Sequence, residues 1–165
     1  DPAGVRIEEA RRSWSANETA NGDRLADLSR TLAELELARG RLDAAREHID
    51  TSLVLFNYPG GDPPVPGVSS ALSTASRIYL RSRQLERAEV FGRAALGIAE
   101  ATARDTSQSA DVGEALLAVA AVRRAKDDDA GARALLGRAV EALTNGLGAG
   151  HRLTREAIGS RKQAQ

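Results

Sequence analysis

Apolar residues recur every three or four positions in several segments of the chain, and short polar runs separate these segments. In the segment 132–143, alanine, leucine and valine fall on one side of a 3.6-residue helix. The polar run 126–129 comes directly before it, and its aspartates favour a helix start because they accept hydrogen bonds from free backbone N–H groups. Another apolar segment, 116–122, precedes that run. The pattern predicts two antiparallel helices joined by a tight turn.

The same helical hairpin occurs twice more upstream. The second helix of each hairpin carries an alanine that marks the register, and Ala45, Ala88 and Ala132 are 43 and 44 residues apart. Further small residues recur at the same spacing, where they let two helices approach closely. These are Ser52, Ala95 and Ala139 on the second helices and Ala33, Ser76 and Ala120 on the first helices. A repeat of this length predicts an all-α solenoid in which each hairpin packs on its neighbours.

Around Ala45, in the first hairpin, the sequence resembles a tetratricopeptide repeat. The matching residues are Leu32-Ala33, Arg39-Gly40-Arg41-Leu42, Ala44-Ala45, Ile49 and Ser52-Leu53. The long period resembles the kinesin-light-chain-like variety of that family, and residues 147–154 are similar to the loop that joins its repeats. The resemblance covers about residues 24–157 and implies a right-handed superhelix that serves as a platform for binding proteins.

The repeats depart from the family pattern at two kinds of position. Arg83 and Asp127 stand where the family prefers the turn glycine found at Gly40. Asp129 stands where it prefers an apolar residue. These departures leave the fold expectation unchanged, and the resemblance implies no particular partner.

The repeat divides the chain into hairpins and connectors. We expect three tetratricopeptide-like hairpins, at residues 24–57, 68–103 and 111–145. The expected connecting and terminal segments are an N-terminal helix with its connector (1–23), a proline- and glycine-rich connector (58–67), a polar connector (104–110), and a connector with a C-terminal capping helix (146–165). The N-terminal helix is either a cap or the remnant of an upstream repeat. Because the chain begins with Asp1 and contains no methionine, we expect either a processed product or a piece cut from a longer protein, and the two ends favour the piece.

Composition narrows the function classes. Lys and Arg together number 23, as do Asp and Glu, so the formal charge is zero and general nucleic-acid binding is not expected. No apolar run is long enough to span a membrane, and there is no cysteine for a disulfide or a thiolate site. The alanine- and arginine-rich, lysine-poor composition favours a bacterial protein. The sequence does not determine the compartment: the cytoplasm is favoured, and an exported fragment is left open.

The residues available for catalysis are few. His48 and His151 lie far apart in the repeat order, so they are not expected to form an acid–base pair. The three aspartates 127–129 fit a solvated helix start better than a cation site, which needs ligands spread around a loop. A phosphate-binding loop follows a strand, and no strand is predicted before the glycines at 146, 148 and 150. We therefore expect a protein that is not an enzyme and has no metal or cofactor.

A concave groove is the better candidate site. In tetratricopeptide arrays the first helices line this groove, so the residues opposite the packed stripes face it. Those residues are Asp27, Arg30, Glu34 and Leu37 on the first hairpin, Ser70, Ser73, Arg77, Leu80 and Arg81 on the second, and Glu114, Leu117, Ala121 and Arg124 on the third. The arginines among them suit carboxylates on a peptide. The alternative is ordinary solvated charge with pairs along one helix.

The predicted binding residues are therefore Asp27, Arg30, Glu34, Arg77, Leu80, Arg81, Glu114 and Arg124. The repeats that hold chaperone C-termini use asparagines on these helices, and none occurs here, so chaperone-tail binding is not expected. The leading hypothesis is a module that binds a peptide, a protein surface or a second copy of itself. The other is a regulatory or sensor segment of a larger bacterial signalling protein, whose catalytic or DNA-binding domain lies elsewhere.

Overall fold

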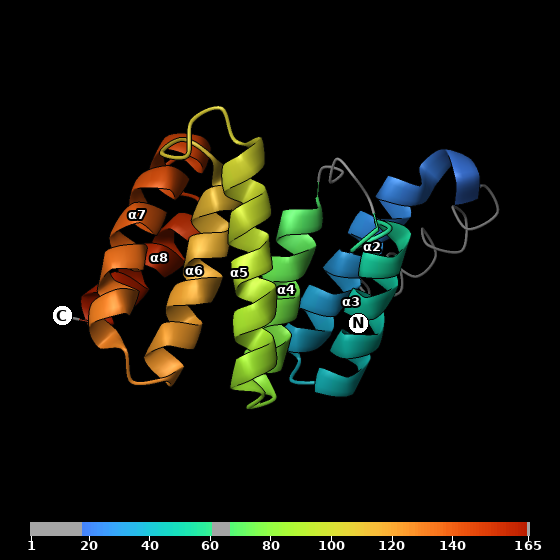
Figure 1. The fold of residues 1–165 in the computed structure, drawn as a ribbon, viewed down its shortest axis with the longest axis horizontal. Helices are drawn as coiled ribbons and strands as arrows, with labels where there is room; N and C mark the ends of the chain where they lie inside the picture. Colours follow the sequence, from blue (N-terminus) through green and yellow to red (C-terminus); the bar gives the residue numbers. More distant parts are fainter. Residues whose placement is uncertain (1–17, 61–66, 165) are drawn as a thin grey trace.

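The computed structural model describes residues 18–60 and 67–164, and the residues that it describes form helices and no strand (Figure 1). The helices are α2 (Glu18–Ala38), α3 (Leu42–Leu55), α4 (Val68–Arg81), α5 (Leu85–Thr102), α6 (Ala110–Ala125), α7 (Asp129–Leu147) and α8 (Arg152–Gln163). The helix predicted within residues 1–16 lies outside the described residues.

The helices pair into hairpins, and the hairpins stack side by side (Figure 1). α2 pairs with α3, α4 with α5, and α6 with α7, while α8 packs on α7. The first helices also meet across hairpins, since α4 contacts both α2 and α6. The predicted all-α solenoid of helical hairpins with a C-terminal capping helix is therefore confirmed.

The small residues that mark the repeat are buried contact points. All nine of the alanines and serines at the shared positions are 0% exposed: Ala33, Ala45, Ser52, Ser76, Ala88, Ala95, Ala120, Ala132 and Ala139. Both serines also hold two helices together. Ser52 Oγ donates to the Ala26 carbonyl oxygen at 2.8 Å, and Ser76 Oγ donates to the Ala88 carbonyl oxygen at 2.7 Å. A buried hydroxyl needs such an acceptor, because burying it without one costs free energy.

The turns of the three hairpins share one backbone conformation. Gly40, Arg83 and Asp127 have φ values of 76°, 60° and 60°. In each turn the N–H of that residue bonds three positions back, and the next N–H bonds five back, as at Gly40 N to Leu37 O (3.0 Å) and Arg41 N to Glu36 O (2.9 Å). This left-handed cap satisfies the carbonyl groups that a helix end leaves free.

The structure differs from the expected boundaries at the N-terminal side. The connector predicted at residues 17–23 is helical from Glu18 onward, so α2 is longer than the apolar stripe indicated. Once the stripe of Leu25 and Leu32 fixes the helix, each further residue adds a hydrogen bond without a new nucleation step. A polar sequence can therefore extend a helix that it could not start.

Candidate functional site

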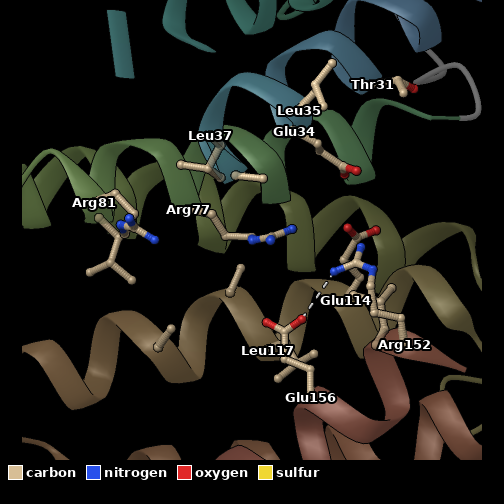
Figure 2. A pocket seen from close by; sticks show the side chains of 15 residues that line it. Thr31, Glu34, Leu35, Leu37, Arg77, Arg81, Glu114, Leu117, Arg152 and Glu156 are labelled. Carbon is tan, nitrogen blue, oxygen red and sulfur yellow. Dashed lines mark hydrogen bonds and ion pairs between the residues drawn. The ribbon is translucent and has the colours of Figure 1, made fainter. Parts of the chain in front are cut away.

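A cavity of about 610 Å³ opens between α2, α4, α6 and α8 (Figure 2). This volume lies within the range of ordinary ligand sites. The lining residues are Thr31, Glu34, Leu35, Leu37 and Ala38 from α2, Arg77, Leu80 and Arg81 from α4, Glu114, Leu117, Ala118 and Ala121 from α6, and Arg152, Leu153 and Glu156 from α8. We call this cavity the groove. Four helices from separate parts of the sequence build it, so it exists only when the hairpins are stacked.

The structure brings five of the eight predicted binding residues to the groove. They are Glu34, Arg77, Leu80, Arg81 and Glu114. Asp27, Arg30 and Arg124 are not among its lining residues. Thus the predicted row of four arginines becomes a pair, Arg77 and Arg81, one turn apart on α4.

Arg30 is held by its own helix. Its guanidinium donates to Glu34 Oε1 at 3.0 Å and to Asp27 Oδ1 at 3.4 Å. Glu34 Oε1 also accepts from Thr74 Oγ1 on α4, at 3.3 Å. Arg30 therefore forms ion pairs along its own helix, which is the alternative to a role in binding. A ligand would have to break these contacts to reach its guanidinium group.

Arg77 and Arg81 are differently placed. Within the described part of the chain, neither side chain forms an ion pair or a hydrogen bond. Figure 2 shows Arg81 at one end of the groove, and the Arg77 side chain extending along it toward the end where Glu34 lies. Two guanidinium groups without carboxylate partners can each form paired hydrogen bonds with an anion from outside.

Glu114 lies on α6, at the end of the groove opposite Arg81 (Figure 2). Its Oε2 accepts a hydrogen bond from Ser70 Oγ of α4 at 2.9 Å. Burial raises the pKa of this carboxyl above its ordinary value. The Ser70 hydrogen bond lowers the pKa, the nearby Glu34 carboxylate raises it, and Arg30 and Arg77 lower it. The net result is a carboxyl group that holds its proton more tightly than an exposed glutamate does.

Apolar side chains form about half of the groove wall. They are Leu35, Leu37, Ala38, Leu80, Leu117, Ala118, Ala121 and Leu153. Leu37, Leu117 and Ala121 come from the face that the sequence assigned to the groove. Ser73, assigned to the same face, is buried instead, and its Oγ has no hydrogen-bond partner in the structure. The groove therefore offers apolar contact next to two open cations.

None of the binding residues predicted from the sequence lies on α8, which is predicted there as a cap on the third hairpin. In the structure this helix also places Arg152, Leu153 and Glu156 in the groove wall. Arg152 Nη1 lies 3.5 Å from Glu156 Oε2. His151 caps the start of α8, because its Nδ1 accepts a hydrogen bond from the Leu153 N–H at 3.3 Å. The missed signal was the inter-repeat loop before it, since such a loop leads into another first helix, the kind that lines a groove.

In the described residues, no group of three or more His, Asp or Glu side chains converges in a way that could hold a metal ion. The aspartate run at the third turn forms a helix start, with Asp128 Oδ1 accepting from the Gly131 N–H at 2.8 Å. Of the helices described, none has both the length and the apolar character needed to cross a membrane.

Comparison with known proteins supports the fold. No family model and no curated protein matches the sequence. Among solved structures, the chain is similar to BtubC (BKLC), a kinesin light chain-like protein from P. vanneervenii, with a TM-score of 0.72 and 18% sequence identity. The match covers 99% of this chain and 63% of that one, so the chain spans somewhat less than two thirds of the length of this neighbour. The fold is that of a helical repeat protein of the tetratricopeptide-like kind.

Proposed function

We propose that this chain is a protein-binding scaffold of the kinesin-light-chain-like tetratricopeptide kind, and that its groove binds an extended peptide segment carrying carboxylates. The fold supports the first part, because helical hairpins stacked in this way build a long surface rather than a closed catalytic pocket. The composition of the groove supports the second part. The partner would be a peptide or a segment of another protein, without a cofactor.

The observation that carries the proposal is the arginine pair. Arg77 and Arg81 line the groove and have no carboxylate partner in the described part of the chain. Elsewhere in the structure arginines are commonly paired, as Arg138 is with Glu100 at 2.7 Å and Arg93 with Glu89 at 2.8 Å. Charge-assisted hydrogen bonds to two guanidinium groups favour an anionic ligand, and the adjacent leucines favour apolar neighbours of that anion.

The arrangement and chemistry of the groove walls also suit a peptide. Leu37, Leu80 and Leu117 come from three different hairpins and line the same cavity as the arginine pair. A ligand that contacts all three must cross the hairpin boundaries, as an extended chain does. The scaffold is already ordered by hairpin stacking, so binding loses little conformational entropy on the protein side.

Selection from a random peptide library tests the proposal. We expect the peptides that bind the wild-type chain to be enriched in aspartate and glutamate. Their affinity should fall at least about tenfold in the variant Arg77→Glu/Arg81→Glu, because each reversal replaces an attraction by a repulsion. The matched control is Arg104→Glu/Arg124→Glu, which changes the total charge equally at arginines outside the groove lining. Its affinity should stay close to that of the wild type.

Three results would count against the proposal. The library yields no binder, the binders show no acidic enrichment, or the two double variants lose affinity to the same extent. Circular dichroism spectra and unfolding midpoints of both variants must first match those of the wild-type chain. A loss of affinity then reports on the groove and not on folding.

A further inference from the structure

Glu114 occupies an unusual place for a carboxylate in a groove built to receive anions. It lines the same cavity as Arg77 and is partly buried, and its Oε2 accepts from Ser70 Oγ at 2.9 Å. Figure 2 shows Arg77 extending along the groove from α4, with Glu114 contributed by α6 on the facing wall. An ionised Glu114 would act on Arg77 as a weak internal counter-ion and would repel a ligand anion placed there.

We propose that an anionic ligand bound at Arg77 drives the uptake of one proton at Glu114, so that the groove binds such a ligand more tightly as the pH falls. This inference rests on the proposed function, since it concerns the same ligand class and the same groove.

The charges around Glu114 come from three helices. From α4, Ser70 donates a hydrogen bond to it and Arg77 acts on it through space. From α2, Glu34 and Arg30 act on it in opposite directions. From α8, Arg152 and Glu156 line the same cavity and lie near each other, with 3.5 Å between Nη1 and Oε2. α5 and α7 pack on other sides of α6, and within the described residues no charged side chain of theirs acts on Glu114.

This arrangement fixes the direction of the effect. Burial already raises the pKa of Glu114 in the empty groove, and Arg77 is one of two cations that oppose that rise. A ligand anion that binds Arg77 cancels its positive charge and adds a negative charge beside the carboxyl group. Both changes disfavour the ionised form, so the pKa in the complex is higher than in the free protein.

The dependence of affinity on pH follows from linkage. Below the pKa of Glu114 in the free protein, the carboxyl is neutral in both states and the affinity is highest. Above the pKa in the complex, it is charged in both states and the affinity is lowest. Between these limits the complex binds more protons than the separated molecules, so affinity falls as the pH rises.

The test needs a ligand whose own charge does not change with pH. We would use a six-residue peptide of alternating leucine and cysteic acid with an amidated C-terminus and an uncharged BODIPY dye on its N-terminus, because its sulfonates stay ionised, the dye has no group that titrates in this range, and its leucines suit the apolar wall. Fluorescence anisotropy then gives its Kd for the wild-type chain between about pH 5 and pH 8, a range above the ordinary glutamic acid pKa. We expect affinity about tenfold higher at the acidic end, the scale of a typical coupling between sites.

Two variants locate the proton. Glu114→Gln keeps a side chain that can accept from Ser70 but carries no charge, so it should bind tightly and equally across the range. Glu156→Gln removes an exposed carboxylate of the same groove and should keep the pH dependence of the wild type. His151→Asn removes the histidine at the start of α8, next to Arg152 of the groove, and asparagine still caps the helix.

The outcomes separate the inference from the proposed function. If the peptide binds and Glu114→Gln has the same pH dependence as the wild type, or if neither depends on pH, the proton-uptake inference is wrong while peptide binding stands. If the dependence disappears in His151→Asn and not in Glu114→Gln, the proton sits at the start of α8 and the inference is also wrong. If the peptide binds to none of these proteins at any pH, the proposed anion site fails, and the inference fails with it.

Discussion

At the scale of single residues, the three hairpin turns have the same backbone conformation but carry three different side chains. Gly40, Arg83 and Asp127 occupy equivalent positions and all have positive φ. Glycine adopts this conformation without a Cβ clash, whereas the other two residues are strained there. Both are exposed, and neither side chain forms an ion pair in the described part of the chain, so the strain has no evident compensation.

Replacing these residues by glycine should therefore stabilise the fold. We expect Arg83→Gly to raise the free energy of unfolding by about 0.5–1 kcal/mol, since the relief of strain exceeds the entropy that glycine adds to the unfolded chain. Asp127→Gly should gain less, because aspartate tolerates left-handed φ better than arginine does. Urea unfolding measures both changes.

The control is Gly40→Ala. A Cβ at Gly40 meets no atom within 4 Å, so its effect reports on backbone conformation alone. It should lose about 1 kcal/mol. If Arg83→Gly and Gly40→Ala shift the unfolding midpoint in the same direction, left-handed strain does not explain the turns.

At the scale of helices, the sequence pattern predicts the packing faces well and the helix ends poorly. The stripes and the shared small residues depend only on a 3.6-residue period, and the marked alanines are buried as that period requires. From the sequence, Arg83 and Asp127 were only departures from the turn glycine at Gly40, and the structure shows that all three residues share a positive φ. The start of α2 escaped prediction, because a polar helix end leaves no apolar pattern.

The groove was predictable only in part, for a similar reason. Repeat position identifies which face of α4 carries Arg77 and Arg81, and the structure puts both in the groove. Pairing between side chains is not visible in a periodic pattern, so the capture of Arg30 by Glu34 was only one of two alternatives. The contribution of Arg152 depends on how far the stack curves from α2 to α8, and spacing along the chain does not determine that curvature.

Two helix glycines give a prediction about packing between helices. A Cβ on Gly113 of α6 would lie 2.5 Å from Leu143 Cγ and 3.2 Å from the Leu143 backbone N, so α6 and α7 would have to separate. We expect Gly113→Ala to lower the free energy of unfolding by about 1–3 kcal/mol. A Cβ on Gly137 of α7 meets nothing within 4 Å, and Gly137→Ala should gain up to about 1 kcal/mol from helix propensity.

Thermal or urea unfolding of the two alanine variants checks this pair. Both substitutions add the same methyl group inside a helix, so the difference between them isolates the close approach of α6 to α7. Equal effects of either sign would mean that the helices can shift apart at little cost in free energy.

At the scale of the whole molecule, the stack is not equally tight along its length. α5 packs on α6 more extensively than α3 packs on α4, and α4 adds direct contact with α6. In a linear array the stability is roughly the sum of each hairpin and its interfaces, so the weaker junction divides the molecule. The first hairpin should therefore open separately from the two that follow it, although the groove draws residues from all three.

Native-state hydrogen exchange followed by mass spectrometry tests this division. We expect Leu32→Ala, which removes a side chain only 2% exposed in α2, to lower protection in α2 and α3 by at least about tenfold while leaving α6 and α7 nearly unchanged. The matched variant Leu136→Ala, at a residue 1% exposed in α7, should act mainly on α6, α7 and α8. If Leu32→Ala instead lowers protection evenly from α2 to α8, the array unfolds as one unit. In that case the groove also forms and is lost as a whole. If the first hairpin opens separately, the α2 side of the groove, which carries Glu34 and Leu37, moves away from the arginine pair before the rest of the stack unfolds.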